Sequence, residues 1–416
     1  MTKLWAWTLA TVVIALVSFT ERSWAAAPTE KAIYAFKSGT DGSSPRGSLV
    51  FDSSGNLFGT TEAGGAGNAG TVFELTRTSG GWSEAIVYSF QGGTDGDDPN
   101  AGLVIDGAGN LYGTTVFGGA GSCAAGCGTV FELTPQVNGG SWTESVLYSF
   151  QGDDDGAHPY SGVILDKFGN LYGTASVGGN LLACPTIGGC GTVFELSSAS
   201  GSWTKTTLHT FQGGTQDGAS PNSGLTIDGN GHLYGATSAG GIDNVGLVYE
   251  LYTSNGNWSE KVLHVFTGDC ARGCNPESTL VFNGMGYLVG TVQARNSSFC
   301  CGIVLALVPS SGGTWIEKVV FRFNSPTNTI ATPVFDAQGN YYDTSSLSGR
   351  NGSGRAYRLH WTKGGVTATF FGFCSQYGCP DGAAPSGGVI LDGSGNLYGT
   401  ASFGGLGYGV VYEITP

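Results

Sequence analysis

One pattern of apolar and polar positions recurs along the chain: an apolar run, a short polar turn and a second apolar run. It reads GLVIDGAGNLYGTTVFGG at 102–119 and GVILDKFGNLYGTASVGG at 162–179, and close variants follow at 224–241 and 388–405. The first run is apolar on both faces, as expected of a strand packed between neighbouring sheets. Asp caps the turn and Gly supplies a positive φ, so the second run folds back as a hairpin.

The turn occurs seven times, at positions 53 to 62 residues apart: Asp52, Asp106, Asp166, Asp228, Asn283, Asp336 and Asp392. After each hairpin comes a Gly-Gly loop, a third apolar run such as GTVFELT and a fourth such as WTESVLYSF. A repeat of this length is typical of solenoids, propellers and arrays. Seven units of four strands predict an all-β fold, a seven-bladed β-propeller.

The two ends of the chain complement each other. The last unit stops at GVVYEITP without a fourth strand, while KAIYAF near the N-terminus matches the fourth-strand sequence VLYSF. An N-terminal strand that completes the last blade would close the ring and remove an exposed edge. A β-helix or a pair of sandwiches would not need this match. We therefore predict one propeller over residues 31–416, with Ile33–Phe36 beside Val410–Ile414.

Residues 1–25 have the pattern of a signal peptide. Lys3 precedes an apolar run from Leu4 to Phe19, and small residues near Ala25 suit cleavage after Ala25 or Ala26. The run is shorter than the roughly 20 residues of a spanning helix, so an uncleaved anchor is the lesser alternative. We expect an exported protein, secreted, periplasmic or at the cell surface, with no membrane span once the leader is removed.

The ten cysteines fit an oxidising compartment, because eight of them form close local pairs. These pairs are Cys123/Cys127, Cys184/Cys190, Cys270/Cys274 and Cys374/Cys379. The adjacent Cys300 and Cys301 bond either to each other or to Cys270 and Cys274. A zinc knuckle is the alternative for the CxxxC pairs, but partner histidines are missing. The net charge of −14 argues against a nucleic-acid partner.

The GNLYGTT…GG…GTVFELT units resemble the tandem repeats of the choice-of-anchor GloVer-containing proteins, a group of exported bacterial proteins. The resemblance covers essentially the whole chain after the leader. It implies export and a repeat fold, and it implies no particular activity.

One face of the predicted propeller carries the loops from strand 2 to 3 and from strand 4 to the next strand 1. All ten cysteines fall in these loops, which makes this face long, variable and suited to binding. The D-G-x-x-P loops would place a ring of carboxylates near the channel mouth that suits Ca²⁺, at Asp41, Asp95, Asp155, Asp217 and Asp381. The alternative is that each Asp only caps its own turn. No other cofactor is expected, and His158 is the one histidine in these loops.

Six of the nine arginines lie in units five and six, where the repeat is degraded. Four of them lie in or beside loops of the same face: Arg272, Arg295, Arg350 and Arg355. An arginine patch suits a carboxylate-bearing ligand, since the guanidinium pairs with carboxylates through two hydrogen bonds. Decay of the repeat under weak constraint is the alternative explanation.

Local catalytic motifs such as G-x-S-x-G and H-E-x-x-H are missing, although a propeller can assemble a site from separate blades. The favoured hypothesis is a monomeric, non-catalytic binding module at the cell envelope or outside the cell, with a glycan or an envelope protein as partner. The second is a glycan lyase or hydrolase acting on an acidic polysaccharide, using the arginines with Asp or Tyr partners such as Tyr160 or Tyr377. The third is a structural surface component. The repeated glutamates are expected to be structural: Glu74, Glu132, Glu195, Glu250 and Glu413.

Overall fold

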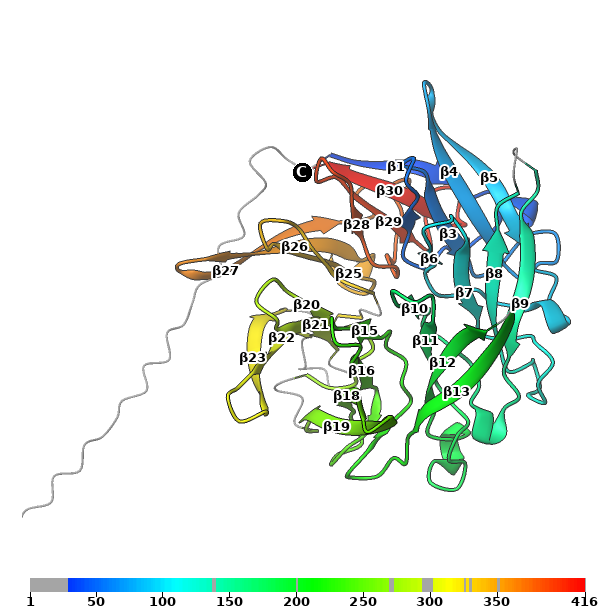
Figure 1. Ribbon diagram of the computed structural model, residues 1–416. Helices are drawn as coiled ribbons and strands as arrows, with labels where there is room; N and C mark the ends of the chain where they lie inside the picture. Colours follow the sequence, from blue (N-terminus) through cyan, green and yellow to red (C-terminus); the bar gives the residue numbers. More distant parts are fainter. Residues whose placement is uncertain are drawn as a thin grey trace, which may run out of the picture.

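The computed structural model describes residues 29–136, 140–199, 201–268, 273–293, 302–324, 327–328, 331–349 and 352–415. These residues form seven four-stranded antiparallel sheets, arranged as blades around a central axis (Figure 1). The predicted seven-bladed β-propeller is therefore confirmed. No helix within the described ranges is long and apolar enough to cross a membrane. The predicted signal peptide lies outside them.

Each blade has a two-residue innermost strand, a five-residue second strand and two longer outer strands, in chain order from the axis outward in blades 1 to 6. Blades 1 to 3 consist of β2 (Val50–Phe51), β3 (Leu57–Thr61), β4 (Thr71–Thr78) and β5 (Gly81–Ser89); β6 (Val104–Ile105), β7 (Leu111–Thr115), β8 (Thr129–Thr134) and β9 (Thr143–Ser149); and β10 (Ile164–Leu165), β11 (Leu171–Ala175), β12 (Thr192–Ala199) and β13 (Ser202–Thr210).

Blades 4 to 6 follow the same plan: β15 (Thr226–Ile227), β16 (Leu233–Thr237), β18 (Leu247–Ser254) and β19 (Asn257–Val265); β20 (Val281–Phe282), β21 (Leu288–Val292), β22 (Ile303–Pro309) and β23 (Trp315–Arg322); and β24 (Val334–Phe335), β25 (Tyr341–Ser345), β26 (Arg355–Thr362) and β27 (Gly365–Gly372). The loops contain a small ladder of β14 (Gly218–Ala219) with β17 (Ala239–Gly240), and short 3-10 turns at η1 (Gly39–Asp41), η2 (Gly93–Asp95), η3 (Asp153–Asp155) and η4 (Pro185–Ile187).

Blade 7 joins the two ends of the chain. It contains β28 (Ile390–Leu391), β29 (Leu397–Ala401), β30 (Val410–Thr415) and, as its outermost strand, β1 (Thr29–Ala35). β1 pairs antiparallel with β30, from Thr29 opposite Thr415 to Ala35 opposite Val410, with a bulge between Ala32 and Tyr34. In Figure 1 the blue first strand lies beside the red last strand. The predicted closure of the ring is therefore confirmed.

The D-x-x-G-N turn forms because the side chain of its aspartate accepts hydrogen bonds from N–H groups within the turn. Asp106 Oδ1 accepts hydrogen bonds from the backbone N–H of Ala108 (2.8 Å) and Asn110 (2.9 Å), and Asp106 Oδ2 accepts one from Asn110 Nδ2 (2.9 Å). Gly109 has φ +90°, which only glycine adopts without strain. The turn returns the chain directly into the second strand, as the sequence pattern predicted.

Neighbouring blades contact each other through residues that recur in every full repeat. Gly70, which directly precedes the third strand of blade 1, packs against Pro99 of the loop that leads into blade 2, and a Cβ atom at Gly70 would lie 2.4 Å from Pro99 Cδ. The Thr114 hydroxyl donates a hydrogen bond to the backbone carbonyl of Ser161 in the next blade (3.0 Å). These contacts explain why glycine, proline and threonine stay fixed in the repeat.

The tryptophans at the start of the fourth strands also contact the neighbouring blade. Trp203 packs edge to face on Tyr112 of the preceding blade, with ring centroids 6.2 Å apart, and Trp258 packs on Tyr172 at 6.4 Å. Edge-to-face pairs of this kind add to the free energy of burial. The tryptophans are therefore part of the blade interfaces.

The Gly70–Pro99 contact yields a stability prediction. Gly70→Ala combines a positive φ of +94° with an overlap against Pro99, whereas Gly55→Ala has a similar φ of +85° and open space around the new methyl group. We expect Gly55→Ala to cost about 1–2 kcal/mol from backbone strain alone. Gly70→Ala should cost about 1–3 kcal/mol more because of the overlap. Urea unfolding of both variants measures the difference, and equal losses would contradict the interface role of Gly70.

Candidate functional site

The two predicted loop classes lie on one face of the propeller. The loop from strand 4 pairs with the strand 2–3 loop of the blade it enters, through backbone bridges that join Asp97 to Phe117 and Ala157 to Val177. Three disulfides close loops on this face: Cys123–Cys127, Cys184–Cys190 and Cys374–Cys379. These predicted pairs are confirmed.

Cys274 is buried in the loop before β20. Cys270, Cys300 and Cys301 lie outside the described residues, so their pairing stays a prediction.

The five D-G-x-x-P aspartates lie in the loops that follow the outermost strands. Asp95 Oδ1 accepts a hydrogen bond from the Tyr88 hydroxyl (2.7 Å) and its Oδ2 accepts one from the backbone N–H of Gln91 (2.6 Å). Asp155 repeats this arrangement with Tyr148 and Gln151, both at 2.8 Å. The carboxylates of the other three also accept backbone hydrogen bonds in their own loops: Asp41 from Lys37, Asp217 from Gln212 and Asp381 from Ser375.

The expected ring of carboxylates at the channel mouth is therefore wrong in position. Each aspartate caps its own loop after an outermost strand, as the alternative explanation proposed, because one of its oxygens accepts a hydrogen bond from a backbone N–H group of that loop. Binding of Ca²⁺ by Asp41, Asp95, Asp155, Asp217 or Asp381 stays a prediction.

A cavity of about 220 Å³ does lie on the axis, and residues from all seven blades line it. The variable part of its lining is the residue that directly follows the proline of each D-G-x-x-P loop or its counterpart. These residues are Arg46, Asn100, Tyr160, Asn222, Glu277 and Ser386. We call this set the post-proline ring. It opens on the loop face, because each member precedes the innermost strand of its blade.

Small residues bring the blades close together directly behind this ring. A Cβ atom at Gly47 would lie 2.5 Å from the carbonyl oxygen of Ala101, and one at Gly102 would lie 2.8 Å from that of Ser48. Below them a second cavity of about 510 Å³ is lined by the innermost strands, with apolar side chains such as Leu103 and Val163. The mouth is therefore polar and varied, and the channel below it is apolar.

Charge gathers on the mouth where blades 1 and 2 meet. Arg46 Nε lies 2.5 Å from Glu62 Oε2. Burial, and then the Glu62 charge, raise the pKa of Asp98 to about 7, while its hydrogen bond from Asn100 opposes the rise. Burial and the charge of Asp98 also raise the pKa of Tyr160, whose side chain is 43% exposed. Asp98 is the group of this sector whose raised pKa lies near neutral pH, and Tyr160 stays protonated beside it.

Of the four arginines in the predicted patch, only Arg355 lies among the described residues. Arg355 begins β26 and is buried, with its guanidinium carbon 4.1 Å from the ring centroid of Phe370 and 5.2 Å from that of Phe323. Arg272, Arg295 and Arg350 lie outside the described residues, so a ligand role for the four arginines stays a prediction.

The structure also shows the surroundings of Tyr377, His158 and the repeated glutamates. Tyr377 is fully exposed in the loop between β27 and β28 and is not among the residues that line the axial cavity. The His158 ring packs on Phe117 at 5.2 Å, and burial lowers its pKa. The repeated glutamates hold tyrosines: the Tyr112 hydroxyl donates to Glu132 (2.8 Å) and the Tyr398 hydroxyl to Glu413 (2.7 Å).

Sequence reasoning missed most of the post-proline ring, including Arg46, Asn100 and Asn222. The sequence does contain a signal for this ring: the residue after the loop proline changes from Arg to Asn, Tyr, Asn, Glu and Ser, while the proline is kept. A position that varies within an otherwise constant repeat, and that faces one shared cavity, is a candidate for ligand recognition.

A family model described as the Gloeobacter/Verrucomicrobia repeat matches residues 23–187 and 183–379. The chain belongs to this repeat family. A search of curated proteins found no match.

Solved structures show distant similarity to this Gloeobacter/Verrucomicrobia repeat protein. A gluconolactonase from Xanthomonas campestris is 11% identical with a TM-score of 0.40, covering 76% of this chain and 85% of its own. A protein assigned as a 6-phosphogluconolactonase from Bacteroides fragilis is 15% identical with a TM-score of 0.49, covering 86% of each chain. A protein assigned as a glucose dehydrogenase from Thermus is 12% identical with a TM-score of 0.41, covering 94% of this chain and all of its own.

A further feature of these repeats is an outer junction between successive blades. It consists of an aromatic or histidine residue near the end of one outermost strand, the loop aspartate after it, and a residue on the outermost strand of the next blade. Tyr88, Asp95 and Glu144 form one such junction. Burial, and then the charge of Asp95, raise the pKa of Glu144 to about 7. In the junction of Tyr34, Asp41 and Glu84, burial and the Asp41 charge raise the pKa of Glu84 to about 7.

The junction carboxyls predict the pH dependence of stability. Folding raises the pKa of Glu84 and Glu144 from 4.5 to about 7, so their contribution is fully present below pH 4.5 and is lost as the pH rises to about 7. The turn residues Asp106 and Asp392 have lowered pKa values, so their contribution is lost as the pH falls through 3.8 and below. Thermal unfolding should therefore have its highest midpoint near pH 5 and a lower one at pH 8.

Glu144→Gln tests how much the Glu144 carboxyl alone contributes to the pH dependence of stability. The neutral amide removes the charge that the junction disfavours, so the variant should gain more stability relative to wild type at pH 8 than at pH 5. Differential scanning calorimetry at both pH values measures the gain. A wild-type midpoint that rises steadily from pH 5 to pH 8 would contradict the assignment.

Proposed function

We propose that the protein is an exported binding module whose axial pocket recognises a polyhydroxylated ligand, a glycan. The observation that carries the proposal is the post-proline ring: six chemically different side chains at one repeat position line a single pocket. The amides of Asn100 and Asn222 and the guanidinium of Arg46 offer the donors and acceptors that sugar hydroxyls require. The half-exposed ring of Tyr160 offers an apolar surface beside them.

The size of the site supports a short segment of such a ligand. The mouth cavity of about 220 Å³ and the channel cavity of about 510 Å³ share Ser48, Gly102, Gly162, Gly224 and Thr332 in their linings, so the two are adjacent along the axis. Their combined size is in the range of small-molecule pockets, which are a few hundred to about 1,000 Å³. Three loop disulfides on this face are compatible with function outside the cytoplasm.

Tyr160→Ala tests the binding site. Because Tyr160 is half exposed at the mouth, its truncation should leave the fold intact and weaken glycan binding by at least about tenfold, equal to about 1.4 kcal/mol. A panel of neutral and acidic oligosaccharides, followed by titration calorimetry of any that bind, measures the affinity. Tyr377→Ala is the matched control, since Tyr377 is an exposed tyrosine outside the cavity.

Two results would overturn the proposal. One is that no oligosaccharide saturates the wild-type protein, which would favour a structural surface component. The other is that Tyr160→Ala and Tyr377→Ala bind equally well, which would place the ligand elsewhere on the protein.

One observation favours an enzyme as a second candidate, a lyase or hydrolase acting on an acidic polysaccharide. The pKa of Asp98 is about 7, close to the value that suits a general acid or base at neutral pH, and Asp98 lies beside Arg46 and Tyr160. Under the binding proposal, prolonged incubation with uronic-acid polysaccharides should give no new reducing ends. Product formation that is lost in Asp98→Asn would replace the binding proposal by the enzyme.

A further inference from the structure

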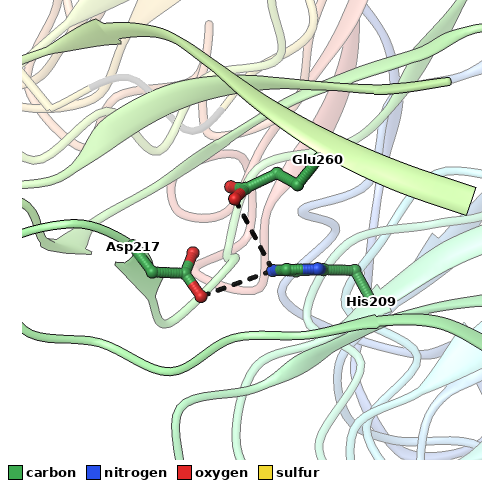
Figure 2. Close-up of side chains that lie close together, drawn as sticks. All are labelled: His209, Asp217 and Glu260. Carbon is green, nitrogen blue, oxygen red and sulfur yellow. Dashed lines mark ion pairs between the residues drawn. The ribbon is translucent and has the colours of Figure 1, made fainter.

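The outer junction between blades 3 and 4 brings one histidine together with two carboxylates. His209 lies near the end of β13, Asp217 in the loop that follows, and Glu260 on β19 of the next blade. Their side chains converge on one point (Figure 2). His209 Nε2 lies 3.4 Å from Asp217 Oδ2 and 4.0 Å from Glu260 Oε2, and one ligand atom from each residue lies within 4.8 Å of the other two.

The histidine replaces a tyrosine at a fixed position in the sheet. His209 pairs with Val193 in the same register as Tyr88 with Val72 and Tyr148 with Val130. The tyrosine hydroxyls donate a hydrogen bond to the loop aspartate, which caps the junction. Imidazole instead brings a nitrogen that can act as a metal ligand, while the aspartate and the glutamate are kept.

The preceding junction shows that this position accepts a cation. In blade 3, Lys205 occupies the strand position that Glu260 holds in blade 4, since each is paired with the equivalent leucine of its neighbouring strand. The Lys205 ammonium lies 2.7 Å from Asp155 Oδ1 and 2.5 Å from the Asp155 carbonyl oxygen. The Lys205 side chain is only 4% exposed, so the junction holds a nearly desolvated positive charge against the loop aspartate.

In the blade 3–4 junction the same place holds a second carboxylate. His209 Nε2 and Glu260 Oε1 are buried; Nε2 faces Asp217 Oδ2 at 3.4 Å, and Glu260 Oε1 forms no hydrogen bond with any described residue. Two carboxylates and one imidazole thus meet at a point where the neighbouring junction places an ammonium.

We propose that His209, Asp217 and Glu260 bind one divalent transition-metal ion of the Zn²⁺ type. Ligand atoms about 2.0–2.2 Å from a common ion lie at most about 4.4 Å from one another, which the two distances from Nε2 satisfy. One nitrogen and two carboxylates suit zinc, whereas Ca²⁺ takes six to eight oxygen ligands. The ion links the outer strands of blades 3 and 4 in the way that Lys205 links blades 2 and 3.

The test uses the EDTA-treated, disulfide-intact protein without an affinity tag, titrated with ZnCl₂ in a calorimeter at pH 7.5. Wild type should bind with one-to-one stoichiometry and show a higher unfolding temperature with zinc. His209→Tyr installs the residue found at Tyr34, Tyr88 and Tyr148 and should weaken zinc binding by more than about tenfold while the protein stays folded. Glu260→Lys, which copies the Lys205 junction, should do the same.

His232→Asn is the matched control. His232 also lies near two carboxylates, with Nδ1 3.0 Å from Glu250 Oε1 and 3.7 Å from Asp228 Oδ2, and most other repeats have asparagine at this position. Zinc binding should survive this change. Zinc binding that is absent in wild type, unchanged in both His209→Tyr and Glu260→Lys, or lost in His232→Asn would overturn the proposal.

Discussion

Contact between neighbouring blades is the constraint on which the rest of the structure depends. The inner strands of each blade are apolar on both faces, so a single blade cannot bury them and needs a neighbour on each side. Gly70 against Pro99 and Thr114 on the Ser161 carbonyl show how successive blades are held. The ring closes with the same parts: Gly409 packs on Pro45, and Thr400 donates a hydrogen bond to the Gly47 carbonyl (3.0 Å).

This constraint also decides where chemistry can vary. The proline, glycine and threonine of each interface are fixed by contact, but the residue after the proline projects toward the axis and the outer junction lies at the rim. Beside the axis, Arg46 of one repeat and Tyr160 of another occupy the same repeat position. At the rim, Lys205 and Glu260 likewise occupy the same position in successive repeats. Both candidate sites therefore lie at repeat positions whose residue type is not fixed by contact between the blades.

The fold could be predicted from sequence because its determinants are local and repeated. Period, turn chemistry and the matching ends specify the blades, their number and the pairing of β1 with β30. The sites could not, since sequence shows that Asp95 recurs but not how far it lies from the axis. A ring at the channel and a cap at the rim fit the same pattern, and only the hydrogen bonds from Tyr88 and Gln91 distinguish them.

Degradation of the repeat in the later blades has a structural explanation at one interface. Asp343 stands where other repeats have the glycine of G-T-T, and it is fully buried. Its Oδ2 accepts hydrogen bonds from Thr291 of blade 5 (2.7 Å), Tyr341 (3.0 Å) and Tyr357 (3.1 Å). Thr291 thus still reaches the next blade, but its acceptor is a carboxylate in place of a backbone carbonyl. The three donors satisfy this buried acid, whereas the same group without them would strongly destabilise the interface.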